Sequence, residues 1–185
     1  MAKIGVCLSG CGVNDGAEIH ESVITALALD CNNAEILFTA PDVNQQKVVN
    51  HLTGDETDET RNVLIESARI ARGNITNLAN IKAADVDGLI FPGGFGAALN
   101  LCDFAVNGAE CDIHPEVARI IHEMNRAGKP IGVICIAPAM MAKALSNSGF
   151  SEKLTIGNDA GTASEMEKLN STHVDCLVDE IVIDE

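Results

Sequence analysis

Cys135 is the side chain of this sequence with the strongest case for covalent chemistry. An apolar, β-branched run at residues 131–134 ends at this cysteine, and a helix-forming run follows with Pro138 in its first turn. A thiol at a tight turn between a strand and a helix is exposed, and the positive end of the helix favours the thiolate, which is the nucleophilic form. We therefore predict that Cys135 is a nucleophile; the alternative is a small buried apolar side chain.

A glycine pair, Gly93 and Gly94, follows a second apolar run at residues 86–91. Without side chains, two consecutive residues can turn their N–H groups toward a substrate oxygen, which is how an oxyanion site is built from backbone alone. The pair could also simply form a turn. Because a nucleophile is predicted nearby, we interpret Gly93 and Gly94 as the oxyanion site.

Two carboxylates lie at the start of a predicted helix at residues 17–29. Glu18 falls in its first turn, where the helix dipole alone favours an acid, and Glu21 lies one turn further on. The functional interpretation places Glu18 beside Cys135, where it would share or move a proton. Glu21 is the rival acid for that role.

Other candidate partners for the cysteine are weaker. His173 and Asp175 form a late histidine–acid pair, which is the partner type that a catalytic cysteine often uses, but no turn signature surrounds them. Cys11 lies in a glycine-rich loop at residues 9–16 and could reach the same crevice as an accessory thiol. There is no complete dinucleotide fingerprint and no phosphate-binding loop.

Strand and helix patterns alternate along the chain, which predicts an α/β fold with a mainly parallel central sheet covered by helices. In such sheets, binding sites lie beyond the carboxyl ends of the strands. The glycine loop, the glycine pair and the cysteine elbow each follow a strand, so we expect them to meet at one crevice if their strands are neighbours. The predicted strands are residues 3–8, 35–40, 86–91, 131–134 and 181–183, and the predicted helices are residues 17–29, 62–72, 114–127, 138–145 and 163–169.

Composition excludes several classes of function. The formal net charge of −15 repels phosphate backbones and anionic lipid headgroups, and the absence of Tyr and Trp removes the usual base-stacking side chains, so we expect neither nucleic-acid nor membrane binding. No apolar run approaches the ~20 residues of a membrane span. Seven cysteines without an export signal indicate reduced thiols and a cytoplasmic location, and without a Cys-x-x-Cys pair we expect no metal.

Several motifs together resemble the ThiJ/PfpI superfamily, and within it the ElbB family, labelled enhancing lycopene biosynthesis proteins. The superfamily pattern is the Pro92-Gly-Gly-Phe-Gly96 turn, the Cys135-Ile-Ala-Pro138 elbow and an early Glu18. The stretches that resemble the ElbB branch are residues 3–13, 15–21, 50–54, 59–66, 92–98, 128–132 and 135–140.

The resemblance implies a flavodoxin-like three-layer sandwich, like that of class I glutamine amidotransferases, and frequent homodimers. It implies one such domain over residues 1–185, which lacks a further C-terminal strand–helix unit. It also implies a cofactor-free, glutathione-independent lyase of the glyoxalase III type that converts small dicarbonyls such as glyoxal to 2-hydroxy acids. Cys135 would form a hemithioacetal, Gly94 and Ile136 N–H groups would hold its oxygen, and Glu18 would shuttle the proton. The ElbB name adds a link to isoprenoid biosynthesis.

Two alternatives stay open at this point. A non-enzymatic redox or stress sensor would use oxidation of Cys135, since an exposed thiol of low pKa suits both roles. A glutamine amidotransferase-type hydrolase would need His173 and Asp175 beside the cysteine.

Overall fold

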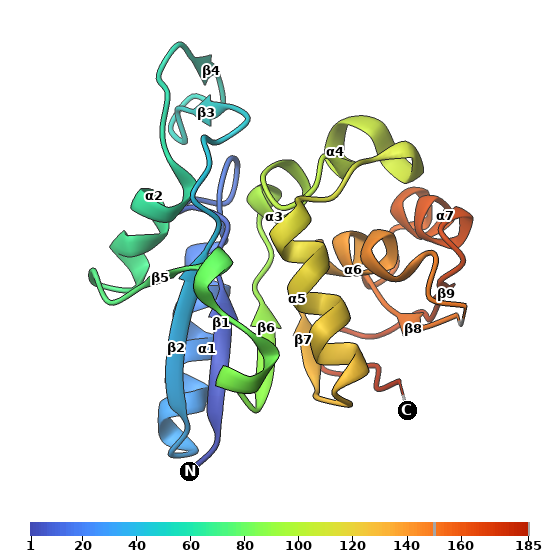
Figure 1. Ribbon diagram of the computed structural model, residues 1–185. Coiled ribbons are helices and arrows are strands. Elements are labelled where there is room, and N and C mark those ends of the chain that lie inside the picture. Colours follow the sequence, from blue (N-terminus) through green and yellow to red (C-terminus); the bar gives the residue numbers. More distant parts are fainter. Residues whose placement is uncertain (150, 185) are drawn as a thin grey trace.

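A five-stranded parallel sheet forms the centre of the molecule. The computed structural model describes residues 1–149 and 151–184. The strand order is β5-β2-β1-β6-β7, and every neighbouring pair in this sheet runs parallel (Figure 1). The predicted α/β fold with a mainly parallel central sheet is therefore confirmed. Its strands are β1 (Lys3–Cys7), β2 (Glu35–Ala40), β5 (Thr76–Asn77), β6 (Gly88–Phe91) and β7 (Ile131–Val133).

The three turns singled out in the sequence meet at one edge of this sheet. Strands β1, β6 and β7 are adjacent, and the chain leaves their carboxyl ends into the glycine loop, the glycine pair and the cysteine elbow. The backbones of the first two turns are hydrogen-bonded to each other: Gly96 N–H donates to Gly16 O (2.9 Å) and Phe95 N–H donates to Val13 O (2.8 Å). The expected convergence on one crevice is thus present.

Helices lie on both faces of the sheet, and the core is uneven between them. Helix α1 lies behind the sheet in Figure 1 and α5 lies in front of it. Among the described residues, most of the fully buried apolar side chains belong to the cluster that joins the sheet to α5 and α6, whereas the buried cluster on the opposite side consists of Val6, Leu8 and Ala17. The helices are α1 (Ile19–Cys31), α2 (Val63–Ile70), α3 (Phe95–Leu99), α4 (Phe104–Asn107), α5 (Pro115–Arg126), α6 (Ala137–Leu145) and α7 (Ala160–Lys168).

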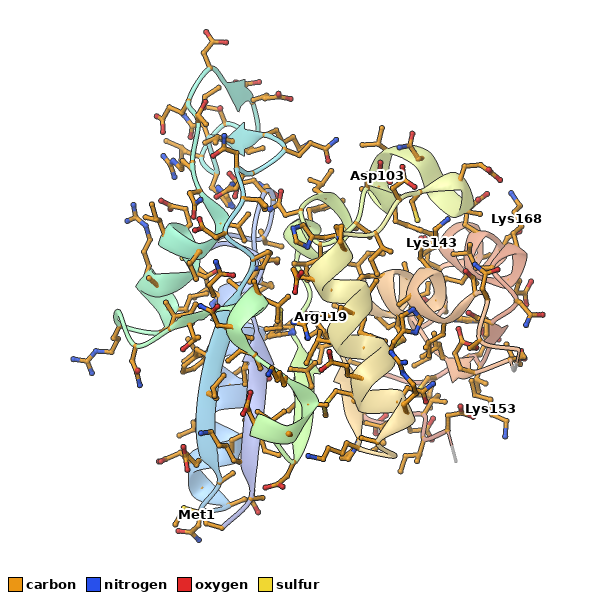
Figure 2. All side chains as sticks on the ribbon, viewed as in Figure 1. Met1, Asp103, Arg119, Lys143, Lys153 and Lys168 are labelled. Carbon is orange, nitrogen blue, oxygen red and sulfur yellow. The ribbon has the colours of Figure 1, made fainter. Side chains whose placement is uncertain are left out.

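Arg119 anchors α5 to the loop that precedes β6. Its guanidinium binds Glu116 and Glu123 on its own helix and donates to the carbonyl oxygens of Leu78 (3.1 Å) and Ile81 (2.9 Å) (Figure 2). Five donors in a rigid fork make arginine suited to tying a helix to neighbouring backbone. The predicted start of α5 is confirmed as well, since His114 caps the helix and Pro115 occupies its first turn.

Two small sheets extend the fold beyond the predicted strands. The antiparallel pair β3 (Val48–Val49) and β4 (Glu56–Thr57) lies at one end of the molecule, and β8 (Lys153–Leu154) pairs with β9 (Thr172–His173) near α7 (Figure 1). The predicted strand at residues 181–183 is wrong: residues 181–184 have no regular structure and make no ladder with the edge strand β7. No helix in the described ranges is long and apolar enough to cross a bilayer.

Candidate active site

Cys135 stands at the tip of a strained elbow between β7 and α6. Its backbone is left-handed (φ 60°), a conformation that costs a non-glycine residue about 1–3 kcal/mol and that clusters at functional sites. The turn is closed by Ala137 N–H donating to Ile134 O (3.0 Å), and α6 begins at Ala137 with Pro138 in its first turn. The side chain of Cys135 is exposed, so the predicted elbow is confirmed and the alternative of a packed apolar side chain is not.

Two backbone N–H groups act on the Cys135 thiol and lower its pKa. They belong to Gly94 and Ile136, two of the residues from which an oxyanion site was expected. The third expected donor is committed elsewhere, because Gly93 N–H donates to Glu21 Oε2 at 2.8 Å. The structure therefore brings two donors to the sulfur and uses the remaining one to hold a carboxylate.

Glu21, rather than Glu18, is the carboxylate beside Cys135. The charge of Glu21 acts on the Cys135 thiol and raises its pKa, and the two residues line the same cavity. Gly93 lies between the side chains of Cys135 and Glu21. A Cβ at this position would lie only 2.4 Å from Cys135 Cβ and 2.7 Å from Glu21 Oε2. Only glycine leaves room for thiol and carboxylate to face each other across this turn.

Glu18 has a different position from the one expected. It is the N-cap of α1, just outside the helix, and its Oε2 accepts the N–H of Glu21 (2.7 Å) while Oε1 lies 2.9 Å from His20 Nδ1. Burial alone would raise the pKa of Glu18, but these contacts with Glu21 and His20 outweigh it and lower the pKa. Glu18 thus orients the first turn that carries Glu21, and no contact joins it to the sulfur in the described residues.

The expected low pKa of Cys135 is wrong. Cys135 is exposed as a whole residue, but its thiol is partly desolvated by the surrounding protein, and this effect raises the thiol pKa most. The Glu21 charge raises it further, and the N–H groups of Gly94 and Ile136 only partly oppose these effects. The resting cysteine is therefore a neutral thiol with a carboxylate beside it. A base already in contact with the thiol takes the place of a preformed thiolate.

We expect Glu21→Gln to move the reactivity of Cys135 to lower pH. The carboxylate opposes formation of the thiolate, so replacing it with an uncharged amide of similar shape lowers the thiol pKa. The measurement is the rate of Cys135 alkylation by iodoacetamide as a function of pH. Glu18→Gln is the matched control and should leave the midpoint unchanged; a midpoint that moves with Glu18 and stays fixed with Glu21 would contradict the placement of the two acids.

Gly94 is required by both its conformation and its surroundings. Its φ is +90°, and a Cβ there would lie 2.4 Å from both Gly16 O and Glu18 N. We expect Gly94→Ala to lower the free energy of unfolding by about 2–6 kcal/mol, the sum of backbone strain and overpacking. Gly54 is the control because its φ of +81° is similar and no atom would lie within 4 Å of its Cβ. Gly54→Ala should cost only about 1 kcal/mol, and equal losses in thermal unfolding would mean that crowding at Gly94 has no effect.

A cavity of about 840 Å³ opens at the thiol. Its lining includes Glu21, residues 133–135, Pro138, residues 153–158 and most of residues 176–182. This size lies within the range of about 300–1,000 Å³ that is typical for small-molecule sites. In the described ranges, no three His, Cys, Asp or Glu side chains come together in a way that could hold a metal ion.

His173 and Cys11 do not join this site. His173 Nε2 accepts the N–H of Ile156 (3.4 Å), and Nδ1 lies 3.9 Å from Asp175 Oδ1, but neither residue is among the described residues that line the Cys135 cavity. The charges that act on Cys11 come from Arg69 and Glu66 of α2 and from Asp15 of the glycine loop, and Cys11 is not among the described residues that line the Cys135 cavity. The structure therefore assembles no cysteine–histidine pair from the candidates that the sequence offered.

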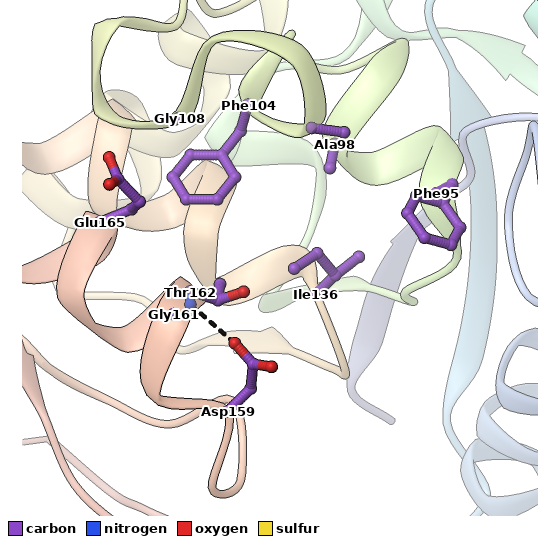
Figure 3. Close-up of a pocket in the computed structure, with 10 residues that line it drawn as sticks. Phe95, Ala98, Phe104, Gly108, Ile136, Asp159, Gly161, Thr162 and Glu165 are labelled. Carbon is purple, nitrogen blue, oxygen red and sulfur yellow. Dashed lines mark hydrogen bonds between the residues drawn. The ribbon is translucent and has the colours of Figure 1, made fainter.

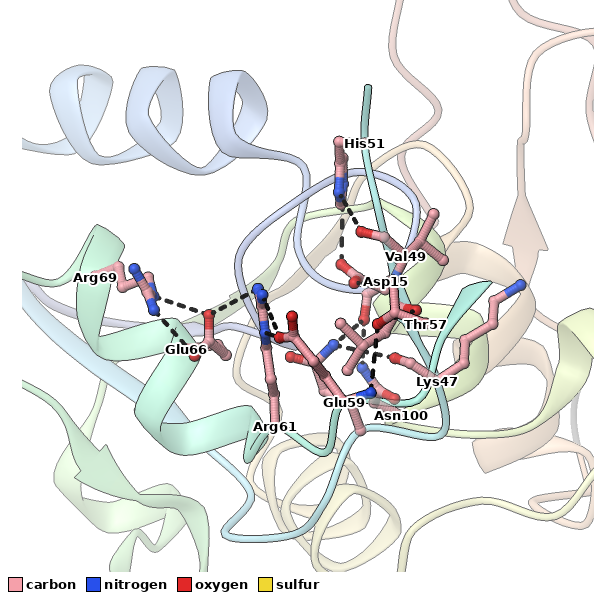
Figure 4. A network of polar contacts seen from close by, with 12 residues as sticks. Asp15, Lys47, Val49, His51, Thr57, Glu59, Arg61, Glu66, Arg69 and Asn100 are labelled. Carbon is pink, nitrogen blue, oxygen red and sulfur yellow. Dashed lines mark hydrogen bonds and ion pairs between the residues drawn. The ribbon is translucent and has the colours of Figure 1, made fainter. Parts of the chain in front are cut away.

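A polar network that sequence reasoning missed holds the glycine loop in place (Figure 4). Asn100 Nδ2 donates to the carbonyl oxygens of Ser9 and Asp15, both at 2.9 Å. Asp15 Oδ2 in turn accepts the N–H of Val49 (2.8 Å), and His51 lies against Gly12. The β3–β4 extension thereby fixes the loop that leads into α1 and Glu21. Residues 50–54 are one of the stretches that resemble the ElbB branch, which singled out this region of the sequence but did not predict its contacts with the glycine loop.

Comparisons with known proteins agree with this fold. No family model matches the chain. It is 47% identical over 182 residues to the human "Glutamine amidotransferase-like class 1 domain-containing protein 3, mitochondrial", an alignment that covers 93% of this chain and 66% of that protein. The chain thus spans about two thirds of the length of this relative.

Two solved structures share the fold of this chain. An "isoprenoid biosynthesis protein with amidotransferase-like domain" from Ehrlichia chaffeensis superposes with a TM-score of 0.88 at 38% identity, over 95% of this chain and 79% of that one. A ThiJ/PfpI domain protein from Brachyspira murdochii superposes with a TM-score of 0.60 at 14% identity, over 98% of this chain and 82% of that one. The second likeness concerns the fold alone.

Proposed function

The chain belongs to the glutamine amidotransferase-like class 1 domain family, and from this premise we propose that it is a cofactor-free, glyoxalase-like enzyme acting on small dicarbonyls. The observation that carries the proposal is that the exposed Cys135 and the Glu21 carboxylate flank Gly93 and line one cavity, with the N–H groups of Gly94 and Ile136 acting on the thiol. A nucleophile, a base and an oxyanion site are the parts that this reaction needs. The reaction is glyoxal plus water giving glycolate, with no net oxidation.

The first step is addition of the thiol to an aldehyde carbon. A sulfur–carbon bond forms while Glu21 takes the thiol proton, and the carbonyl electrons move onto oxygen. That oxygen is attached to the carbon bonded to sulfur, so the N–H groups of Gly94 and Ile136 are within reach of it. Return of a proton to the oxygen gives the hemithioacetal.

The second step is a proton transfer between the two carbons. The Glu21 carboxylate removes the hydrogen from the carbon bonded to sulfur, and the electron pair passes through an enediolate. Protonation of the neighbouring carbon then gives a thioester of the 2-hydroxy acid. Here Glu21 has the role that the sequence assigned to Glu18, and Glu18 is a positioning residue that fixes the first turn of α1.

The last step is hydrolysis of the thioester by water, which releases the 2-hydroxy acid and restores the thiol. The test of the whole proposal is turnover of glyoxal by the purified protein, with Cys135→Ser and Glu21→Gln as variants. Turnover that survives both substitutions would contradict it.

Three further points remain proposals. The membership in the ElbB branch is supported by the Ehrlichia chaffeensis structure, whose name includes isoprenoid biosynthesis and an amidotransferase-like domain. Assembly as a homodimer is implied by the family resemblance. A cytoplasmic location stays a prediction from the sequence, whereas the human relative is named mitochondrial.

A second candidate function is a redox sensor, and the exposed position of Cys135 at a strained elbow favours it. Peroxide would oxidise the thiol to sulfenic and then sulfinic acid, beside the N–H groups of Gly94 and Ile136. Peptide mass spectrometry after mild peroxide treatment tests this role. Selective oxidation of Cys135 in a protein that does not turn over glyoxal would favour the sensor over the enzyme.

A further inference from the structure

Ile136, the residue next to Cys135, lines a second cavity of about 440 Å³. Among the described residues, none lines both this cavity and the cavity at the thiol. We call it the α7 cavity, because α7 forms one side of it. The proposed reaction does not use this cavity.

The α7 cavity is apolar on the side next to the elbow. Figure 3 shows the side chains of Phe95, Phe104, Ile136 and Ala98 around a common space. Phe95 is 51% exposed, whereas Phe91 and Phe104 are 0% and 7% exposed. A half-exposed aromatic ring at the rim of an apolar hollow has contact area to offer a ligand.

This apolar wall is joined to the reacting sulfur through the backbone. Ile136 supplies one N–H donor to the sulfur and sends its side chain into the α7 cavity. Phe95 directly follows Gly94, which supplies the other donor. Ile136 and Phe95 are thus the residues of this cavity that lie next in the chain to the reacting cysteine and to the Gly94 donor.

The far side of the α7 cavity is acidic. Asp159 accepts the N–H of Thr162 (2.7 Å), and Glu165 Oε2 accepts the N–H of Ala109 (3.1 Å). The Thr162 N–H lowers the pKa of Asp159, and Lys168 lowers that of Glu165, so both carboxylates are ionised at neutral pH. An anionic substituent would be repelled here, while an uncharged one would meet only the cost of its own desolvation.

We propose that the α7 cavity takes an uncharged aromatic substituent of the compound bonded to Cys135, so that aryl dicarbonyls are better substrates than glyoxal. The preference among substrates rests on the proposed function, whereas binding of an aromatic group in the α7 cavity does not. The volume supports an aromatic group, since cavities of about 300–1,000 Å³ suit ligands much larger than glyoxal. Burial of a phenyl ring would favour an aryl compound by about tenfold or more over its small analogue.

Alkylation of Cys135 tests the binding without requiring catalysis. The reagents are iodoacetamide and N-benzyl iodoacetamide; each forms a sulfur–carbon bond, releases iodide and gives the thiol proton to solvent. Peptide mass spectrometry gives the two rates at Cys135 and, as an internal reference, at the exposed Cys31 of α1. We expect the benzyl reagent to be favoured at Cys135 by about tenfold relative to Cys31.

A blocking variant and its matched control locate the effect. Thr162 points into the α7 cavity (Figure 3), whereas Ser164 is an exposed residue of the same helix that does not line it. Thr162→Phe should abolish the preference for the benzyl reagent, and Ser164→Phe should keep it. The proposal is overturned if wild type shows no preference, or if Thr162→Phe and Ser164→Phe give the same ratio.

Turnover distinguishes this inference from the proposed function. With phenylglyoxal and methylglyoxal, kcat/KM should favour phenylglyoxal in wild type and lose that preference in Thr162→Phe. A benzyl preference at Cys135 with no turnover of any dicarbonyl would leave the aromatic site standing and remove the enzyme. Turnover of dicarbonyls without any preference for aromatic compounds would support the enzyme and remove the aromatic site.

Discussion

Replacing Cys135 with serine should lower the turnover of glyoxal by at least about 10³-fold. The hydroxyl is a far weaker nucleophile than the thiol and does not ionise near neutral pH, so neither the covalent bond nor the thioester forms. The substitution is small, and the side chain is exposed, so the protein should fold as before. The measurement is kcat/KM for glyoxal, followed by the appearance of glycolate.

Cys31→Ser is the control for this result, because Cys31 is another exposed free cysteine and lies at the end of α1, at a distance in sequence from the elbow. It should leave turnover unchanged. Equal losses in the two variants would indicate a general effect of removing a thiol, and retained activity in Cys135→Ser would exclude the covalent route.

Glu21→Gln should lower turnover by about 10²–10⁴-fold, which is the usual contribution of a positioned acid–base group. The amide oxygen of glutamine can still accept the N–H of Gly93, so the first turn of α1 keeps its contact with the glycine pair. What is lost is the base that takes the thiol proton and then moves the proton between the two carbons. The same variant should lower the pKa of Cys135, so its loss of activity cannot come from a less ionised thiol.

Glu18→Gln separates catalysis from positioning. Glu18 holds the N–H of Glu21 as a helix cap, and removal of a cap costs about 1 kcal/mol. Glutamine retains an acceptor, so turnover should fall by less than about tenfold. A larger loss with Glu18→Gln than with Glu21→Gln would return the proton transfer to Glu18.

The parts of the site that follow from local pattern could be predicted from the sequence. The apolar run that ends at Cys135 and the glycine pair after β6 each carry their own signal, and the parallel order of strands brings them together. The donors Gly94 and Ile136 follow from the same two turns. Within the described residues, the strands and helices that carry these turns lie within a few residues of the predicted ranges.

The identity of the acid could not be predicted, because it depends on where α1 begins. The sequence predicts a helix from residue 17, with Glu18 in its first turn. In the structure the helix begins at Ile19, and Glu18 is its N-cap in an extended conformation. The Glu18 carboxylate therefore accepts the N–H of Glu21, and Glu21 is the acid beside the thiol.

The thiol pKa and the last predicted strand depend on tertiary contacts in the same way. The helix end at α6 favours a thiolate, but burial and the Glu21 charge outweigh it, and neither effect is visible in the residues next to Cys135. The apolar residues 181–183 suit a strand, yet they make no ladder with any strand in the described ranges. Both predictions were wrong because contacts with residues distant in sequence outweigh the preference of the local sequence.

The most direct test of the account is product analysis with the wild-type protein. Purified protein is treated with a chelator and divided into two samples. One sample receives glyoxal in the absence of glutathione, and its products are identified by NMR. The other sample receives glutamine, and released ammonia is measured. The account predicts that glyoxal is converted to glycolate and that glutamine releases no ammonia. Absence of glycolate, or release of ammonia from glutamine, would contradict it.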